Sequence, residues 1–111
     1  MKDINYGDFE KVELRAGTIV SAEDFPAARK PAYILSVDFG EFGIKRSSVQ
    51  VTALYKKEDL VGTQVLGVIN FPPKQIGPFC SECLIVGLSD NKGRVVLVRP
   101  ELLVPNGSKL F

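Results

Sequence analysis

Residues 32–51 read AYILSVDFGEFGIKRSSVQV, and this stretch decides the fold class. In its first half, apolar side chains recur at every second position from Tyr33 to Phe39, which is typical of a β-strand with one buried face. Gly40 and Gly43 follow and predict a hairpin turn. The second half alternates in the same way, so the whole stretch predicts two antiparallel strands joined by a tight turn.

Further strands and one helix are predicted on both sides of this hairpin. Apolar runs bounded by turn residues predict strands at residues 12–22, 65–71, 79–88 and 95–98. Gly17 interrupts the first run and predicts a glycine bulge. Residues 52–60 predict a short helix with Thr52 as its N-cap, whereas the prolines of residues 72–78 predict a loop. A helix between the third and fourth of five or more strands predicts an all-β OB fold, a five-stranded β-barrel with terminal extensions that uses residues 1–111 as one domain.

The composition excludes several classes of function. The chain has 111 residues, of which 45% are hydrophobic and 24% are charged, and 14 basic residues against 13 acidic ones give a formal net charge of +1. This balance excludes a strongly basic coat for nucleic acid. There is no histidine, so mechanisms and metal sites that need an imidazole are excluded. The sequence starts without an apolar stretch and contains no long apolar run. We therefore expect a cytoplasmic protein with no signal peptide, membrane insertion, cofactor or metal.

Cys80 and Cys83 have the spacing of a redox or zinc motif, but their context favours ordinary packing. They lie in a predicted strand, where residues three apart point to opposite faces, and no further cysteine or histidine could complete a zinc site. Two pairs of adjacent acids are interpreted as solvated surface residues: Glu23 with Asp24, and Glu58 with Asp59. No general acid and base are therefore identified, and we predict that the protein is not an enzyme.

Two polar features are candidates for RNA binding. The segment at residues 70–76 presents the Asn70 amide and the Lys74 ammonium group around two stiff prolines, and these groups suit a base edge and a phosphate. The alternative is a proline-rich turn in which Asn70 caps local backbone. Arg46, Ser48 and Gln50 form an outward polar stripe on the second hairpin strand. The alternative for this stripe is a set of ordinary solvent-facing residues.

Large apolar side chains gather at both ends of the chain. A barrel of this size has a limited interior, so we predict that these residues cover a two-fold interface in a homodimer. The predicted interface residues are Ile4, Tyr6, Phe9, Leu102, Leu103, Val104, Leu110 and Phe111. The alternative is that they fold back and cap the barrel of their own chain.

Motifs along the whole chain resemble the small, freestanding tRNA-binding-domain proteins, most closely the CsaA-type secretion chaperones. The motifs that carry the resemblance lie at residues 9–19, 25–32, 38–40, 44–51, 68–76, 79–84 and 104–109. The resemblance implies an OB fold, a homodimer and a set of RNA-contacting positions. Those positions fall on Arg15, Lys30, Ser48, Gln50, Asn70, Lys74, Ser81 and Glu82. In the wider family the same domain is appended to some aminoacyl-tRNA synthetases and to synthetase-associated cytokine precursors.

Two functions follow from the resemblance and are kept open. The first is an ATP-independent chaperone that holds unfolded or export-bound polypeptides, with the secretion machinery as a candidate partner. The second is a freestanding tRNA-binding protein that recognises folded RNA. Two positions depart from the wider family's pattern. The family usually has a glycine shortly before the Ser–Glu pair, where this chain has Pro78 preceded by Gly77. It also often has a second basic residue after the prolines, where this chain has Gln75. Both departures favour weaker RNA binding and the chaperone function.

Overall fold

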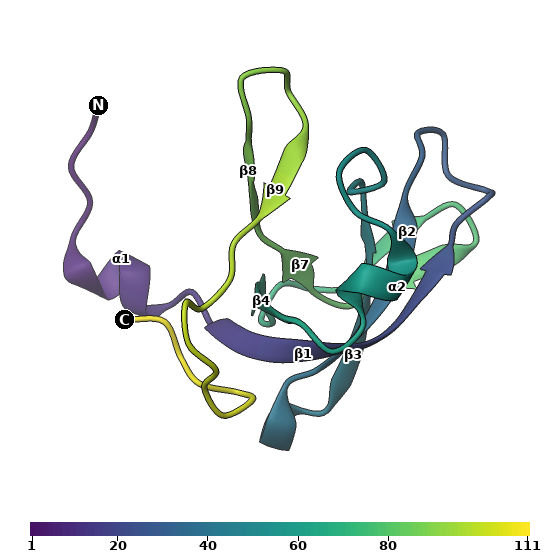
Figure 1. Ribbon diagram of the computed structural model, residues 1–111. Helices are drawn as coiled ribbons and strands as arrows, with labels where there is room; N and C mark the ends of the chain where they lie inside the picture. The colour runs from purple at the N-terminus through teal and green to yellow at the C-terminus, as the bar shows by residue number, and fades with distance from the viewer.

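Strand β1 (Leu14–Asp24) lies at the centre of the computed structural model, which describes all 111 residues. It pairs along its first half with β4 (Gln64–Val68) and along its second half with β2 (Tyr33–Asp38). Strand β3 (Ile44–Val49) pairs with β2, and β7 (Leu84–Ile85) pairs with β4. These five antiparallel strands, in the order β3-β2-β1-β4-β7, coil into a nearly closed barrel (Figure 1). The OB-type fold predicted from the sequence is therefore confirmed.

The barrel closes between its two edge strands, β3 and β7, through one pair of residues. Glu82 lies just before β7, and its N–H donates to the Arg46 carbonyl at 2.8 Å. The Glu82 carboxylate in turn accepts from the Arg46 N–H at 3.0 Å. No strand pairs with this edge of β3. Strand β6 (Phe79–Ser81) packs beside this edge without forming a ladder with it, so the main-chain groups there are not bonded to a neighbouring strand.

The interior of the barrel confirms the alternation predicted for the hairpin. Its turn is a short 3-10 helix, η1 (Gly40–Phe42), and the apolar face of β2 points inward. Burying each large aliphatic or aromatic side chain stabilises the fold by about 1.5–3 kcal/mol. Eleven buried residues make up the main core: Ile19, Leu35, Val37, Phe39, Val49, Val51, Leu60, Val65, Cys83, Ile85 and Leu97.

The irregularity in β1 lies beyond Gly17, so the predicted bulge at this glycine is wrong. The register between β1 and β2 shifts between Ile19 and Ser21. Gly17 itself is in regular register with β4. A Cβ at this position would lie 2.6 Å from Val37 Cγ1 and 2.8 Å from Phe39 Cδ1. Glycine is required here because the core packs against bare backbone, not because the strand bends.

The helix between β3 and β4 is shorter than predicted. Helix α2 (Lys57–Leu60) is a single turn, and Thr52 lies in a separate turn rather than at its N-cap. Tyr55 explains the difference. Its hydroxyl accepts from the Leu97 N–H at 3.0 Å, and its carbonyl accepts from the Tyr33 hydroxyl at 2.8 Å. These tertiary bonds engage a carbonyl that a longer helix would use internally.

The proline-rich segment forms a strand where the sequence predicts a loop. Strand β5 (Lys74–Ile76) pairs with β6 (Phe79–Ser81) in a hairpin that turns at Gly77 and Pro78. The prolines lie on either side of β5 and not within it. Every N–H that the short ladder needs is therefore present.

The single strand predicted over residues 79–88 is three shorter strands. The first is β6, the second is β7, and the third is β8 (Gly87–Ser89). Each has a different partner, because β6 pairs with β5, β7 with β4, and β8 with β9 (Val95–Leu97). The long apolar run thus serves three ladders instead of one.

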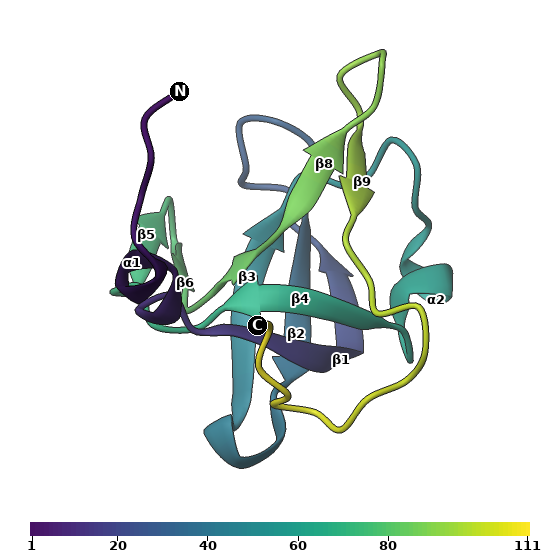
Figure 2. The same ribbon diagram turned by 90° about the vertical axis from the view of Figure 1, so that its left-hand side faces the viewer.

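The end of the chain returns to β1 as an irregular additional partner. The Ala16 N–H donates to the Ser108 carbonyl at 2.9 Å. The buried Gln64 amide holds the same segment, because Nε2 donates to the Val104 carbonyl at 2.7 Å and Oε1 accepts from the Val104 N–H at 3.1 Å. Helix α1 (Tyr6–Glu10) and the C-terminus lie toward the same end of β1 (Figures 1 and 2). Neither helix has the length and hydropathy needed to cross a membrane.

Candidate functional site

A groove runs along the open edge of β3, and Ser48 lies at its centre. Three adjoining pockets of about 350, 630 and 340 Å³ open here, and Ser48 lines all three. The first reaches β5 and β7, the second reaches the β1–β2 loop, and the third reaches β8 and β9. We call these pockets together the β3 groove; its lining residues are drawn from residues 27–32, 47–50, 71–77, 81–89 and 95.

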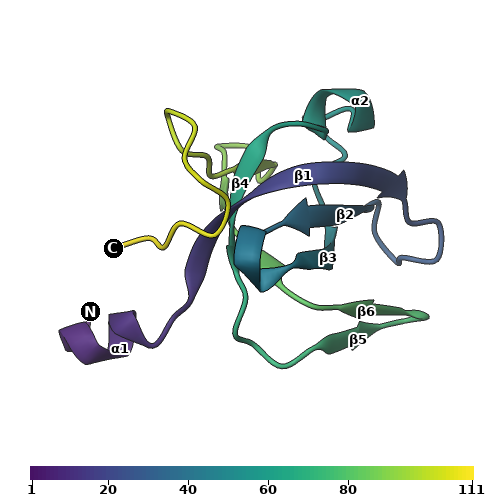
Figure 3. The same cartoon turned by 90° about the horizontal axis from the view of Figure 1, so that it is seen from below.

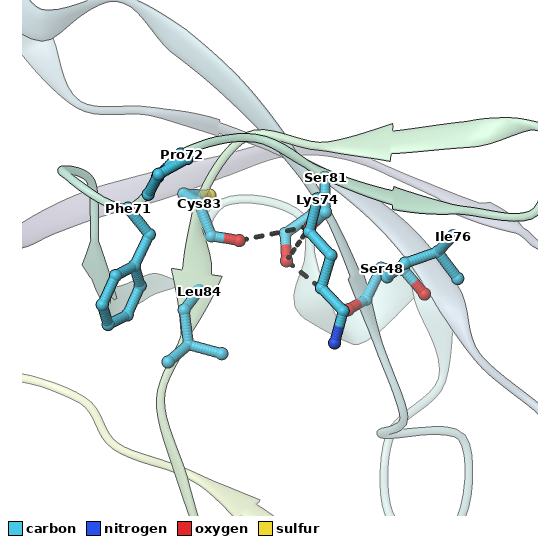
Figure 4. A pocket seen from close by; sticks show the side chains of 9 residues that line it. Ser48, Phe71, Pro72, Lys74, Ile76, Ser81, Cys83 and Leu84 are labelled. Carbon is cyan, nitrogen blue, oxygen red and sulfur yellow. Dashed lines mark hydrogen bonds between the residues drawn. The ribbon is translucent and has the colours of Figure 1, made fainter.

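The first of these pockets, which reaches β5 and β7, combines a cation, a hydroxyl and an exposed aromatic ring (Figure 4). In this view Phe71, Pro72 and Leu84 line one side of the pocket, and Ser48 and Lys74 line the other. The Phe71 side chain is 54% exposed, and Lys74 takes part in no ion pair. An accessible ring and an unpaired ammonium group suit stacking on a base and contact with a phosphate.

A small second core fixes one wall of the β3 groove. The Phe79 ring of β6 packs edge-on against Phe25, with ring centroids 5.6 Å apart. Ala32 and Ile34 complete this buried cluster. The Arg46 guanidinium lies 5.1 Å from the Phe79 ring centroid, a cation–π contact. The β5–β6 hairpin is thereby held beside β3 (Figure 3).

Positive charge collects in the β3 groove although the chain as a whole is nearly neutral. Arg29, Lys30 and Lys74 line the groove, and no aspartate or glutamate does. None of these three cations forms an ion pair within the chain. The groove therefore attracts anionic groups through a local charge that the overall balance conceals.

The structure brings five of the nine predicted RNA-binding residues to the β3 groove. These are Lys30, Ser48, Gln50, Lys74 and Ser81. Ser81 is buried, and its hydroxyl lies 3.3 Å from Ser47 Oγ and 3.2 Å from the Cys83 carbonyl. This hydroxyl is already engaged within the protein. RNA contact by the five residues stays a prediction.

Arg46 and Glu82 lie at the point where the barrel closes. The main chain of Arg46 is bonded to Glu82, and its guanidinium is stacked on the Phe79 ring. The Glu82 carboxylate is occupied by the Arg46 N–H. Neither residue lines the β3 groove, although each adjoins in sequence a residue that does.

Arg15 lies outside the β3 groove, against the C-terminal segment. Its Nη1 donates to the Gly107 carbonyl at 3.0 Å, and its Nη2 pairs with the Glu13 carboxylate at 2.7 Å. The guanidinium also lies 4.5 Å from the centroid of the Phe42 ring. All of these partners belong to the chain itself, so the geometry gives Arg15 a structural role.

Asn70 is exposed, but its amide holds the segment that leads into β1. Its Nδ2 donates to the Lys11 carbonyl at 2.7 Å, and its Oδ1 accepts from the Glu13 N–H at 3.1 Å. The Asn70 amide therefore caps backbone, as the alternative interpretation of this segment proposes. That backbone is distant in sequence and not local.

Glu13 joins β1 to the C-terminal segment. Its carboxylate pairs with Arg15 and, at 2.7 Å, with Lys109. The hydrogen bond from Arg15, followed by that from Lys109, holds the pKa of Glu13 below its usual value of 4.5. The charged form of Glu13 is thus favoured by the folded state.

Most of the terminal apolar side chains are exposed to solvent and do not pack on their own barrel. Seven of the eight predicted interface residues are exposed in this chain: Ile4, Tyr6, Leu102, Leu103, Val104, Leu110 and Phe111. Phe9 is half-buried, with its ring centroid 6.2 Å from that of Tyr6. The exposure argues against the alternative in which these side chains cap their own barrel. Their role in a dimer stays a prediction.

The β3 groove also contains residues that the sequence did not mark as site residues, among them Phe71, Arg29, Leu84 and Leu88. The basic pair in the 25–31 loop is the available signal for Arg29, which adjoins Lys30. No local pattern marks Leu84 and Leu88, because only tertiary structure divides their run into separate strands. Both leucines are exposed, at 50% and 65%.

Both cysteines are free. Cys80 is exposed, whereas Cys83 belongs to the main core, which confirms the packing interpretation for Cys83. Burial raises the pKa of the Cys83 thiol to about 12. The thiolate that redox chemistry requires is thus strongly disfavoured at this position.

Comparison with known families decides the identity of the fold. The family model of the tRNA binding domain matches residues 14–109, which contain the whole barrel and most of the C-terminal segment. The chain belongs to the tRNA-binding domain family. The family expected from the sequence motifs is thereby confirmed.

Two solved structures resemble this tRNA-binding domain over nearly its whole length. A chaperone CsaA from Bacillus anthracis is 46% identical, covers 99% of this chain and 100% of its own, and has a TM-score of 0.94. A CsaA chaperone protein from Picrophilus torridus is 44% identical, covers 98% of this chain and 100% of its own, and has a TM-score of 0.91.

Methionine–tRNA ligases also contain a similar domain. The ligase of Methanocaldococcus jannaschii is 35% identical over 111 residues, which are 99% of this chain and 17% of the ligase. This tRNA-binding domain therefore spans a small part of the length of the ligases that it matches.

Proposed function

We propose that this protein is a homodimeric, cytoplasmic chaperone of the CsaA type that binds unfolded or export-bound polypeptides without ATP. The observation that carries the proposal is the similarity to a chaperone CsaA, with 46% identity and complete coverage of that chain. The β3 groove supports it, because exposed Leu84, Leu88 and Phe71 offer apolar surface to a client. The proposal includes no catalytic step.

The chaperone activity is tested with a chemically denatured client enzyme. Stoichiometric amounts of the protein should suppress aggregation of the client in the absence of nucleotide. Leu84→Lys should weaken the suppression, because it places a charge on the apolar wall of the groove. Leu54→Lys is the matched control, since Leu54 is an exposed leucine outside the groove. Unaltered aggregation with the unmodified protein would refute the proposed function.

The dimer is tested by light scattering after gel filtration. The protomer mass is 12.2 kDa, and we expect particles of about twice that mass. Leu103→Glu should shift the particles to the protomer mass, because Leu103 is 84% exposed among the terminal apolar residues. Leu54→Glu should leave the mass unchanged. Protomer mass for the unmodified protein would remove the dimer from the proposal.

A second candidate function is that of a freestanding tRNA-binding protein. Three unpaired cations beside an exposed Phe71 ring, in a groove without acids, favour it. In gel shifts with total tRNA, Lys74→Ala should lower the slope of log affinity against log salt by about 0.7–0.9. Lys92→Ala is the control, because Lys92 is an exposed cation outside the groove. An unchanged slope for Lys74→Ala would remove Lys74 from the RNA site.

The two departures from the family pattern lie in the β5–β6 hairpin. Pro78 forms part of its turn, and Gln75 donates from Nε2 to the Gly77 carbonyl at 2.8 Å. Gln75 therefore stabilises the turn and leaves the hairpin without a second cation beside Lys74. We propose that this exchange weakens RNA binding relative to polypeptide binding.

A further inference from the structure

The main-chain groups of Ser48 point into the β3 groove rather than into the sheet. In the register of the β2–β3 hairpin, the Phe39 N–H donates to the Gly43 carbonyl. This bond makes Phe39 and Gly43 a hydrogen-bonded pair, and such pairs recur at every second position of an antiparallel ladder. The main-chain groups of odd-numbered β3 residues therefore bond to β2, and those of even-numbered residues face away from it. Arg46 follows this rule, because both of its main-chain groups bond to Glu82. Ser48 is the next even-numbered residue, and no strand pairs with its side of β3.

Apolar side chains flank this open edge on both sides. Ile76 of the β5–β6 hairpin lies on one side of Ser48 and Leu84 on the other (Figure 4), and Leu88 shares a pocket with Ser48 and Leu84. The Ser48 carbonyl accepts only a long bond, from Ser47 Oγ at 3.4 Å, and keeps a second lone pair. Main-chain groups that form no ladder, beside apolar surface, are a template for pairing with another chain. The groove therefore offers a polypeptide both main-chain and side-chain contacts.

The charges of the groove define the chemistry of the occupant. Lys74 lies at the centre of the groove, Arg29 and Lys30 lie toward one end, and no acidic residue lines it. Acidic side chains next to apolar ones complement this surface. An RNA strand would satisfy the cations, and its phosphates or bases could accept from the Ser48 N–H, but it presents no apolar side chains to Ile76 and Leu84. The combination favours a polypeptide.

We propose that an extended polypeptide segment with apolar and acidic side chains binds in the β3 groove as an added β-strand. Its main chain pairs with Ser48, its apolar side chains contact Ile76 and Leu84, and its acidic side chains face Lys74 and Arg29. This inference rests on the proposed chaperone function and specifies how a client is held. Main-chain pairing is largely independent of client sequence, whereas the charges and apolar walls supply preference.

The test uses a fluorescein-labelled peptide of alternating valine and glutamate, with binding followed by fluorescence anisotropy. A matched peptide is N-methylated at every second residue along the edge that pairs, and another carries lysine in place of glutamate. Ser48→Pro removes the N–H on the side away from β2 and so spares the β2–β3 ladder. Ser48→Ala removes the hydroxyl and keeps the N–H. Circular dichroism verifies that both variants are folded.

We expect Ser48→Ala to bind the peptide more tightly than Ser48→Pro, because alanine keeps the main-chain N–H. Ser48→Pro and the N-methylated peptide should each weaken binding by about fivefold, because each removes a main-chain hydrogen bond. The lysine peptide should bind less tightly than the glutamate peptide, and added salt should reduce the difference. The N-methylated peptide tests the pairing even where Ser48→Pro perturbs the fold.

The outcomes separate this inference from the proposed function. Strand addition would be refuted if the protein suppresses client aggregation but neither Ser48→Pro nor N-methylation alters the peptide affinity. The proposed chaperone function would remain in that case. Failure to bind any denatured client or peptide would overturn both. Lys74-dependent binding of a single-stranded RNA in the groove, with no peptide binding, would identify nucleic acid as the occupant and refute the inference.

Discussion

Replacing Arg15 by alanine separates two roles for one cation. The family resemblance makes Arg15 an RNA contact, whereas its guanidinium has partners within the chain in Gly107, Glu13 and Phe42. We expect Arg15→Ala to destabilise the fold by loosening the C-terminal segment from β1. The salt dependence of tRNA binding should stay the same, because Arg15 does not line the β3 groove.

The size of the effect follows from the contacts of Arg15. A hydrogen bond from a charged donor to the Gly107 carbonyl contributes about 1.5–3 kcal/mol, and the cation–π contact with Phe42 about 0.5–1 kcal/mol. The ion pair with Glu13 is screened by solvent and adds little. The Arg15 Nε is buried without a protein acceptor, and its removal recovers about 1 kcal/mol. The expected net loss is about 1–3 kcal/mol in the free energy of unfolding.

Urea unfolding and tRNA gel shifts on the same variants check this prediction. Arg15→Lys should fall between the unmodified protein and Arg15→Ala, because lysine keeps the charge and loses the planar fork of donors. Lys74→Ala should show the opposite pattern, with stability unchanged and a lower salt slope. A stability loss below about 0.5 kcal/mol for Arg15→Ala, combined with a salt slope lowered by about 0.7–0.9, would show that Arg15 contacts RNA instead.

Three further predictions concern the core and the end of β1. In the native protein at about pH 8, a thiol reagent should label exposed Cys80 and spare Cys83, which is buried and whose pKa is raised to about 12 by that burial. Two labels per native chain would contradict this. Glu13 stabilises the fold above its unfolded-state pKa of 4.5, and this contribution disappears as the pH falls through its lowered folded-state pKa. The unmodified protein should therefore lose more stability than Glu13→Gln between about pH 5 and pH 3 in urea unfolding, and equal losses would refute the linkage. Gly17→Ala should lower the free energy of unfolding by about 1–3 kcal/mol in the same assay, because the new methyl group would lie 2.6 Å from Val37 Cγ1. An unchanged stability would mean that the core rearranges around the methyl group without cost.

Strand alternation and turn residues made the barrel predictable from the sequence. The period of two in residues 33–39 is a local property of the chain, and it places Leu35 and Val37 in the core. The position of the helix between β3 and β4 is equally local. The candidate site was predictable only in part: outward Ser48 and exposed Lys74 follow from alternation and from the prolines, and the structure brings them to the same pocket.

Partners that are distant in sequence account for the features that the sequence did not reveal. Tyr55 makes its bonds to other strands, and these shorten the helix. Asn70 and Arg15 carry the residue types of an RNA site, but their nearest partners are the segments that lead into and out of the barrel. The sequence shows which chemical groups the side chains carry, but it does not show whether those groups are already bonded to partners within the chain.

The sequence by itself determined that the chain forms a small β-barrel and which strand faces are apolar, because both follow from periodicity over a few residues. Tertiary structure alone decided that the barrel closes at Arg46 and leaves Ser48 on an open edge. The β3 groove lies along that edge because no strand pairs with it. Strand pairing joins residues far apart in the chain, so no local pattern records which edge stays free.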